Sequence, residues 1–170
     1  MIFNKVIEEQ QIQGDIKVNY REAIRSIILE KNKILLVHSN KGDYKFPGGG
    51  VEGNESHSEC LIREVAEETG YINCIVKDKL GSVIERKLDE YDNTALFQMT
   101  SHYYHCELIN DKRIAQKLDD YESAQEFSAE WVSLDNAIEQ NEKIINSFEI
   151  EKNGWLKREI YVLKKLKKIY

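Results

Sequence analysis

Residues 49–71 read GGVEGNESHSECLIREVAEETGY, and this stretch decides the fold around it. Ser56, followed three residues later by Glu59, forms a capping box, which marks the start of a helix. Gly70 stands where a helix often ends, because glycine adopts the left-handed backbone conformation without strain. The pattern predicts one helix with an apolar face and a cluster of glutamates on another side. The apolar face comprises Leu61, Ile62, Val65, Ala66 and Thr69, and the glutamates are Glu64, Glu67 and Glu68.

These three glutamates are spaced so that their side chains are neighbours on the helix surface. Carboxylates this close repel one another and raise each other's pKa unless a cation neutralises them. Mg²⁺ and Mn²⁺ prefer oxygen ligands, so the cluster is a candidate metal site. A solvated acidic face on an exposed helix is the alternative. The preceding FPGGG loop, residues 46–50, favours the metal site because its unobstructed backbone reaches the start of the same helix.

The segments on either side of this helix predict an α/β sandwich with a mixed sheet. Residues 23–29 and 33–38 are β-branched runs with a polar turn between them, which predicts a hairpin. Further strands are expected at 72–76, 81–85, 94–99, 103–108 and 129–134, and a helix from Asp135 to about Ile145. We expect a single domain over residues 1–170. Within it, residues 1–20 are an extra strand or a dimer contact, and residues 154–170 are a C-terminal amphipathic helix.

The composition is that of an ordinary globular protein. Of the 170 residues, 41% are hydrophobic and 32% charged, and no apolar run approaches the ~20 residues of a membrane span. Three cysteines without paired spacing and an N-terminus unlike a secretory signal predict a cytoplasmic protein without disulfides or membrane contact. Residues 151–170 carry seven Lys/Arg against two Glu, so the net charge of −6 leaves −11 on the first 150 residues. This acidic body disfavours nucleic acid as a partner and stays compatible with a small phosphorylated substrate accompanied by Mg²⁺.

The quoted stretch resembles the Nudix box of the Nudix hydrolases, which include the MutT-like proteins. The pattern G-x5-E-x7-R-E-U-x-E-E-x-G-U, with U a bulky aliphatic residue, is matched in register from Gly49 to Gly70. Tyr71 departs from it, being aromatic, and we expect altered packing there with unaltered chemistry. The resemblance implies the Nudix fold, an α/β/α sandwich with a mixed sheet and a catalytic loop-helix-loop. It also implies hydrolysis of a diphosphate linked to another moiety, usually a nucleoside, with Mg²⁺ or Mn²⁺.

The resemblance also implies roles for individual residues. Arg63 and Glu55 match the pair that orients the helix and its glutamates, and we expect Glu67 or Glu68 to touch the attacking water. A further acid from a later loop is expected as base or extra ligand, with Glu126 the first choice and Glu122 the second. The implied metal ligands are Glu64, Glu67, Glu68 and the backbone carbonyl of Gly48, and the catalytic residues are Glu67, Glu68, Arg63 and Glu126. Arg25, Lys45 and Phe46 are assigned to substrate binding, with ordinary surface charge as the alternative for the two cations.

The substrate is the least determined feature. The family's markers for NADH and ADP-ribose need a proline downstream of the box, and the single proline of the chain, Pro47, lies upstream. The tyrosine that marks dinucleoside-polyphosphate hydrolases is missing at residues 87–89. Elimination of these substrate classes leaves a nucleoside-triphosphate-type small molecule as the expected substrate. A non-catalytic nucleotide sensor and an RNA-processing pyrophosphohydrolase stay open as alternatives, although the presence of all three glutamates favours an enzyme. A homodimer and the number of metal ions also stay open.

Overall fold

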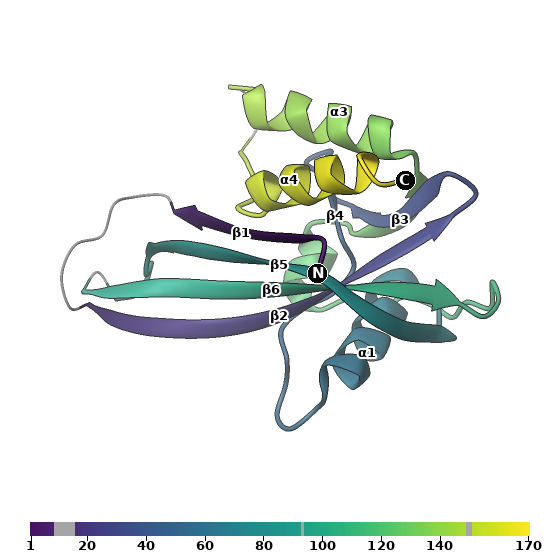
Figure 1. Cartoon of the computed structure of the whole chain (residues 1–170), viewed down its shortest axis with the longest axis horizontal. Helices are drawn as coiled ribbons and strands as arrows, with labels where there is room; N and C mark the ends of the chain where they lie inside the picture. Colours follow the sequence, from purple (N-terminus) through teal and green to yellow (C-terminus); the bar gives the residue numbers. More distant parts are fainter. Residues whose placement is uncertain (9–15, 93, 149–150) are drawn as a thin grey trace.

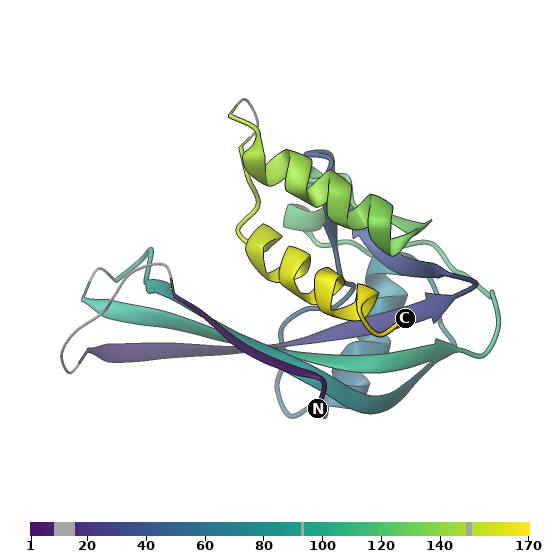
Figure 2. The ribbon, with the colours of Figure 1, turned by 45° about the horizontal axis from the view of Figure 1, so that its top comes forward.

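The computed structural model describes residues 1–8, 16–92, 94–148 and 151–170. A sheet forms the middle layer, helix α1 covers one face, and helices α3 and α4 cover the other (Figures 1 and 2). This layering confirms the expected α/β sandwich. In the part described, no helix is long and apolar enough to cross a membrane. The elements are β1 (Phe3–Glu8), β2 (Lys17–Glu30), β3 (Lys33–His38), β4 (Tyr44–Lys45), α1 (His57–Thr69), β5 (Cys74–Leu88), β6 (Ala95–Leu108), α2 (Asp120–Ala124), β7 (Ser128–Val132), α3 (Leu134–Asn146) and α4 (Leu156–Lys167).

The strands that the structure describes form one seven-stranded mixed sheet. Their order is β1-β5-β6-β2-β3-β4, with β7 paired to β3. β5 and β6 pair antiparallel, whereas β1 with β5 and β2 with β6 pair parallel. β2, β5 and β6 are long and extend well beyond the helices, as Figure 1 shows. Because β2 pairs with β6 over residues 17–28 and with β3 at its end, it joins this extension to the helix-covered part of the sheet.

Helix α1 begins and ends where the sequence predicts. The Ser56 side chain accepts a hydrogen bond from the Glu59 N–H, and the Glu59 carboxylate accepts one from the Ser56 N–H. Gly70 has a φ of 80°, and its N–H donates to the Ala66 carbonyl. Both ends of the helix are therefore fixed by local hydrogen bonds, which sets the position of its glutamates.

Two long strands replace four short ones in the middle of the chain. The strands expected at 72–76 and 81–85 are one strand, β5, and those expected at 94–99 and 103–108 are one strand, β6. Polar side chains interrupt the apolar pattern there. The backbone ladder nevertheless continues, with register shifts that accommodate the irregular stretch between Val76 and Gly81.

Other boundaries differ less from expectation. β2 begins at Lys17, ahead of its apolar run, and Ser133 rather than Asp135 caps α3. The short β4 and α2 were not expected. The first twenty residues contain β1, residues 9–15 lie outside the described ranges, and a dimer contact in this region stays a prediction.

Apolar packing holds β2 from both faces. Ile24 packs in a cluster with Leu61 of α1 on one side of the sheet. Ile27 packs in a second cluster with Leu163 of α4 on the other side. Each fully buried aliphatic side chain contributes roughly 1.5–3 kcal/mol. β2 is therefore a rigid support for whatever lies against its middle.

Candidate active site

The loop 46–50 is tied to β2 by backbone hydrogen bonds. The Ile24 N–H donates to the Gly49 carbonyl at 2.9 Å, and the Ser26 N–H donates to the Pro47 carbonyl at 2.8 Å. The Ser26 hydroxyl donates to the same Pro47 carbonyl at 3.2 Å. The loop therefore runs along β2 before it reaches α1, and its backbone lies between the sheet and the glutamates.

A side chain would meet other atoms at two positions of this loop. Gly48 has a φ of 139°, and a Cβ there would overlap the carbonyl oxygen of Ile24. At Gly49 a Cβ would overlap the carboxylate of Glu64. At Gly48 only a residue without a side chain lets the loop lie this close to β2, whereas at Gly49 the absence of a Cβ leaves room for the Glu64 carboxylate in its observed position.

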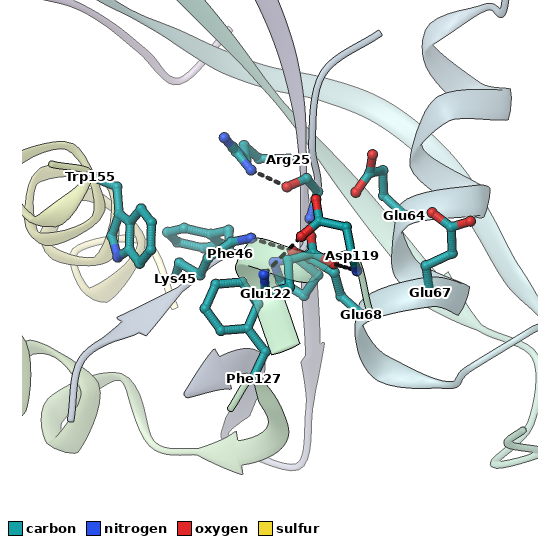
Figure 3. Close-up of polar contacts among 12 residues, drawn as sticks. Arg25, Lys45, Phe46, Glu64, Glu67, Glu68, Asp119, Glu122, Phe127 and Trp155 are labelled. Carbon is teal, nitrogen blue, oxygen red and sulfur yellow. Dashed lines mark hydrogen bonds and ion pairs between the residues drawn. The ribbon is translucent and has the colours of Figure 1, made fainter. Parts of the chain in front are cut away.

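Three carboxylates converge where α1 and α2 meet. Oxygen atoms of Glu64, Glu68 and Glu122 lie within 4.8 Å of one another. Glu68 is fully buried, Glu64 is 7% exposed, and Glu122 is half-buried. Figure 3 shows Glu68 beside Glu122 and shows Glu67 apart from both. Because carboxylate oxygens are the ligands that Mg²⁺ and Mn²⁺ prefer, these residues fit a hard divalent cation.

The pKa shifts within this group reflect burial and mutual repulsion. Burial raises the pKa of Glu64, and the neighbouring Glu68 raises it further. Burial also raises the pKa of Glu122 to about 7, again with a contribution from Glu68. A divalent cation among the three oxygens would remove the repulsion and favour the ionised forms.

Lys45 supplies a positive charge to the carboxylate group. Its ammonium donates to Glu68, whose other oxygen accepts the Gly48 N–H at 2.7 Å. The ammonium also lies 4.7 Å from the centre of the Phe127 ring and 5.9 Å from that of Trp155. Cation–π attraction stabilises a desolvated ammonium in such a place. Lys45 therefore lies between the carboxylates and the aromatic rings of Phe127 and Trp155.

Arg63 and Glu55 form the expected pair. Arg63 donates to Glu55 from Nη2 at 2.7 Å and from Nε at 3.1 Å, and these bonds lower the pKa of Glu55 to about 2. From Nη1 it donates to Glu64 at 2.7 Å and to Glu67 at 3.1 Å. One guanidinium therefore orients two of the box glutamates.

A cavity of about 700 Å³ adjoins the carboxylate group. It extends from Glu122 and the 48–49 backbone to the start of α4 and along the long strands. Its cations include Arg21, Arg25, Lys45 and Lys157, its acids include Glu85, Asp89, Glu90 and Asp119, and its aromatic rings include Tyr121, Phe127 and Trp155. Cations and flat apolar rings around one cavity suit a phosphorylated ligand that carries a planar group.

The structure brings some of the expected acids together and leaves others apart. Glu122, the second choice among the loop acids, lies in the carboxylate group with Glu64 and Glu68. Glu126, the first choice, is exposed and outside that group, at a position where φ is 53°. Glu67 also lies outside the group of three and is held by Arg63.

Three residues of the box region have contacts that the sequence did not specify. Phe46 is fully buried against Tyr103 at 5.3 Å and does not line the cavity, so its ring is not placed for substrate binding. The Gly48 carbonyl, expected to bind metal, accepts a hydrogen bond from Arg25. Tyr71 is buried, and its hydroxyl accepts a hydrogen bond from the Trp131 indole at 2.9 Å, so this residue acts in packing.

The aromatic side chains that line the cavity were not predicted from the sequence. Tyr121, Phe127 and Trp155 contact one another edge to face, with ring centres 6.1–6.5 Å apart. Tyr121 and Phe127 lie in one stretch from α2 to the start of β7, whereas Trp155 lies at the start of α4, and no spacing rule connects the two segments. One sequence feature could have indicated these rings. Trp155 is a large apolar residue that stands before the first turn of an amphipathic helix and not on its buried face.

Comparison with known proteins agrees with the fold. A sequence model of the NUDIX domain matches residues 19–151. An ADP-ribose pyrophosphatase of Methanocaldococcus jannaschii is 44% identical over 54 residues, which are 29% of this chain and 32% of that protein. An 8-oxo-dGTP diphosphatase of Buchnera aphidicola is 38% identical over 58 residues, which are 31% of this chain and 45% of that protein. The matched segments thus span less than half the length of these relatives.

A solved structure shares the fold. The crystal structure of a MutT protein from Methanosarcina mazei superposes with a TM-score of 0.53 at 21% identity. The match covers 91% of this chain and 99% of that chain. At this level of identity, the likeness supports the arrangement of strands and helices described above.

Proposed function

The chain belongs to the Nudix family, and from that premise we propose that it hydrolyses a diphosphate linkage in a nucleoside diphosphate derivative, with Mg²⁺ or Mn²⁺ as cofactor. A nucleoside-triphosphate-type substrate is the first choice. The observation that carries the proposal is the group of Glu64, Glu68 and Glu122 beside a cavity that Arg25 and Lys45 also line. Carboxylates alone would repel a diphosphate, whereas the same carboxylates with a bound cation can hold one.

The carboxylate group is the proposed metal site. Glu64, Glu68 and Glu122 would hold the cation, and the box pattern adds Glu67 and the Gly48 carbonyl. When bound, the metal neutralises diphosphate oxygens and lowers the pKa of a water ligand.

The surrounding residues orient these ligands before any metal binds. Arg63 fixes the carboxylates of Glu64 and Glu67, and the Gly48 N–H fixes that of Glu68. Ligands held by neighbouring hydrogen bonds do not have to be reorganised during the reaction. The loop and the helix therefore act as one preorganised unit.

The attacking water needs a carboxylate that accepts its proton. We retain Glu67 or Glu68 as the residue that touches this water. Among the loop acids we now place Glu122 before Glu126, because Glu122 lies in the carboxylate group. Its pKa of about 7 also suits proton transfer near neutral pH.

The cations and the aromatic side chains of the cavity favour a triphosphate as the substrate. By their names, the two relatives act on ADP-ribose and on 8-oxo-dGTP, so both a sugar-linked diphosphate and a triphosphate are compatible with the family. Arg21, Arg25 and Lys157 favour the more anionic of these ligands. A planar base can stack on Trp155. The cytoplasm stays the expected compartment, and the three cysteines are buried and unbridged.

Hydrolysis of a substrate panel by the purified protein tests the proposal. The panel comprises canonical and oxidised nucleoside triphosphates, ADP-ribose, NADH, dinucleoside polyphosphates, nucleotide sugars and capped RNA. Each is incubated with Mg²⁺, Mn²⁺ or EDTA, and the products are separated by chromatography. We expect turnover of at least one triphosphate, lost in EDTA and lost in folded Glu67→Gln and Glu68→Gln variants.

Other outcomes point elsewhere. Turnover that survives Glu68→Gln would contradict the metal-site assignment. If no compound of the panel is hydrolysed although the protein binds metal and nucleotide, the result would favour a nucleotide sensor. Turnover of capped RNA alone would favour an RNA-processing function.

A further inference from the structure

Two histidines and a glutamate meet on the face of the sheet that α1 covers. His57 is the first residue of α1, Glu22 lies in β2, and His102 lies in β6. The Nε2 atom of His57 lies 3.2 Å from Oε1 of Glu22, and the Nε2 atom of His102 lies 2.8 Å from the same oxygen. Imidazole nitrogens together with a carboxylate oxygen are ligands that Zn²⁺ prefers in proteins. The three side chains are therefore candidate ligands of one ion.

The two imidazole rings have the separation that a shared zinc ion requires. Their centres lie 5.3 Å apart, and their planes are 24° from parallel. Two imidazoles bound to one tetrahedral Zn²⁺ through bonds of about 2 Å have ring centres about 5 Å apart. Ligand atoms of such an ion lie about 3.3 Å from each other, close to the observed 2.8 and 3.2 Å. Rotation of these side chains is then enough to bring both nitrogens and the carboxylate to the ion.

The ligand atoms are available to an ion from solvent. The side chains of Glu22 and His57 are 45% and 34% exposed, and that of His102 is largely buried. Nδ1 of His102 is enclosed and has no hydrogen-bond partner in the part of the chain that the structure describes, so Nε2 is the nitrogen that an ion can reach. Burial and the nearby Lys79 lower the pKa of His102, so its ring is neutral at neutral pH. An ion can therefore enter from solvent, and water can complete its coordination.

Tyr104 holds the ring of His57 in place. Its hydroxyl oxygen lies 2.8 Å from Nδ1 of His57, and the two rings meet edge to face. When an ion binds Nε2, the remaining ring proton is on Nδ1, from which it is donated to the Tyr104 oxygen. Such an outer hydrogen bond fixes the tautomer and the orientation of a metal-bound histidine.

We propose that His57, His102 and Glu22 form a zinc site and that Tyr104 is its positioning residue. The site is separate from the carboxylate group. Glu64 follows His57 by seven residues, which is about 10 Å along a helix, and none of the three ligands lines the cavity. The ion joins α1 to β2 and β6, so it fixes the first turn of the helix that carries the box glutamates. Because it binds the folded protein, it also stabilises the fold.

NMR spectra of the histidine side chains test the site directly. Zn²⁺ is titrated in saturating Mg²⁺, which competes for the carboxylate group. The imidazole signals of His57 and His102 should shift, whereas those of His105 should not, because His105 lies three residues further along β6 and faces the other side of the sheet. Unchanged signals of His57 and His102 would overturn the zinc site, and their contacts would then be hydrogen bonds that join α1 to the sheet.

Isothermal titration calorimetry under the same conditions measures what each residue contributes. Loss of an outer hydrogen bond costs about 10- to 100-fold in metal affinity, so Tyr104→Phe should bind Zn²⁺ about 10-fold more weakly. His57→Gln and His102→Gln each remove a ligand, so the affinity should fall by about 100-fold or more. His105→Gln is the matched control, and it should bind as the wild type does. Zinc binding that is lost in Glu122→Gln but kept in His57→Gln would place the ion in the carboxylate group and overturn the proposal.

Thermal unfolding provides a readout that does not depend on hydrolysis. With Mg²⁺ present, Zn²⁺ should raise the Tm of the wild type and of His105→Gln, because both bind the ion in the folded state. It should not raise the Tm of His57→Gln or His102→Gln. Equal rises in all four proteins would overturn the site. The zinc site and the proposed hydrolysis are thus tested separately, since failure of one leaves the other unaffected.

Discussion

Lys45 and Glu68 form an ion pair that is almost fully enclosed, with 8% of one side chain and 1% of the other exposed. The pair lies where the box pattern implies a metal ligand. A buried carboxylate needs a compensating charge, and the Lys45 ammonium provides one independently of any metal. A divalent cation bound at Glu68 would provide a second. A metal bound at Glu68 would therefore be coupled to the stability of the fold.

Lys45→Met should destabilise the metal-free protein more than the metal-bound protein. Methionine keeps apolar packing near Phe127 but leaves Glu68 unpaired, and breaking a buried pair costs about 3 kcal/mol or more. With saturating Mg²⁺ the loss should shrink, because the cation then compensates Glu68 and stabilises the folded state by binding to it. Urea unfolding in EDTA and in Mg²⁺ measures both free energies of unfolding.

The control for this variant is Lys33→Met. Lys33 is exposed on β3, so its replacement should change neither free energy of unfolding appreciably. Equal losses for Lys45→Met in EDTA and in Mg²⁺ would show that the cation does not bind at Glu68.

Glu122→Gln and Glu126→Gln should differ sharply in activity. The first removes one carboxylate of the proposed metal site, which is also the expected proton acceptor, so kcat should fall by about 100-fold or more. The second changes an exposed side chain outside the group and should leave kcat near the wild-type value. Steady-state kinetics over a range of Mg²⁺ concentrations measures both. Because the same substitution is made four residues apart, a reversed result would identify Glu126 as the functional acid.

Local signals made helix α1 predictable. Ser56, Glu59 and Gly70 fix the ends of α1 through contacts within a few residues, so the sequence alone was enough. The neighbouring positions of Glu64, Glu67 and Glu68 followed from helical spacing. Which of them meet a loop acid did not follow, because Glu122 reaches the group only through the path of the chain between β6 and β7.

Features that depend on distant contacts were not predictable. The pairing of β5 with β6 continues through polar stretches, because backbone hydrogen bonds do not require apolar side chains. Arg25 was one of several cations that suited either a phosphate or the surface, and only the fold shows that it is buried. Phe46 was assigned to substrate binding because of its position in the loop, but its ring is buried in the core against Tyr103.

Gly48→Ala and Gly49→Ala should fail in different ways. At Gly48 the added methyl overlaps a backbone carbonyl at a φ of 139°, so we expect a loss of about 2 kcal/mol or more in the free energy of unfolding. At Gly49 the methyl overlaps the Glu64 carboxylate, which can rotate away, so the fold should persist while Mg²⁺ affinity and kcat fall. Thermal unfolding and the Mg²⁺ dependence of kcat separate the two effects.

Gly53→Ala is the matched control for these variants. Gly53 has a φ of 51° and open space around it, so alanine should cost only the strain of a left-handed conformation, about 1 kcal/mol. Its activity should be that of the wild type. A Gly49→Ala protein with unchanged kcat would argue against the requirement for Glu64 in its observed position.

Glu122 should make the stability of the metal-free protein depend on pH. Its pKa is raised from 4.5 to about 7, chiefly by burial, so the folded protein holds the proton more tightly than the unfolded chain does. Its contribution to stability is fully present below about pH 4.5 and is lost as pH rises through about 7. Solvent reduces the size of the effect, because Glu122 is only half-buried.

Urea unfolding in EDTA between pH 5 and pH 8 measures this contribution. Glu122→Gln keeps a neutral side chain at every pH. As pH rises through about 7, the free energy of unfolding of the variant should therefore increase relative to that of the wild type. Saturating Mg²⁺ should reverse the order at high pH, since an ionised Glu122 is then a metal ligand. A difference between variant and wild type that stays constant over the whole range would mean that Glu122 is ionised throughout and that its neighbours do not repel it.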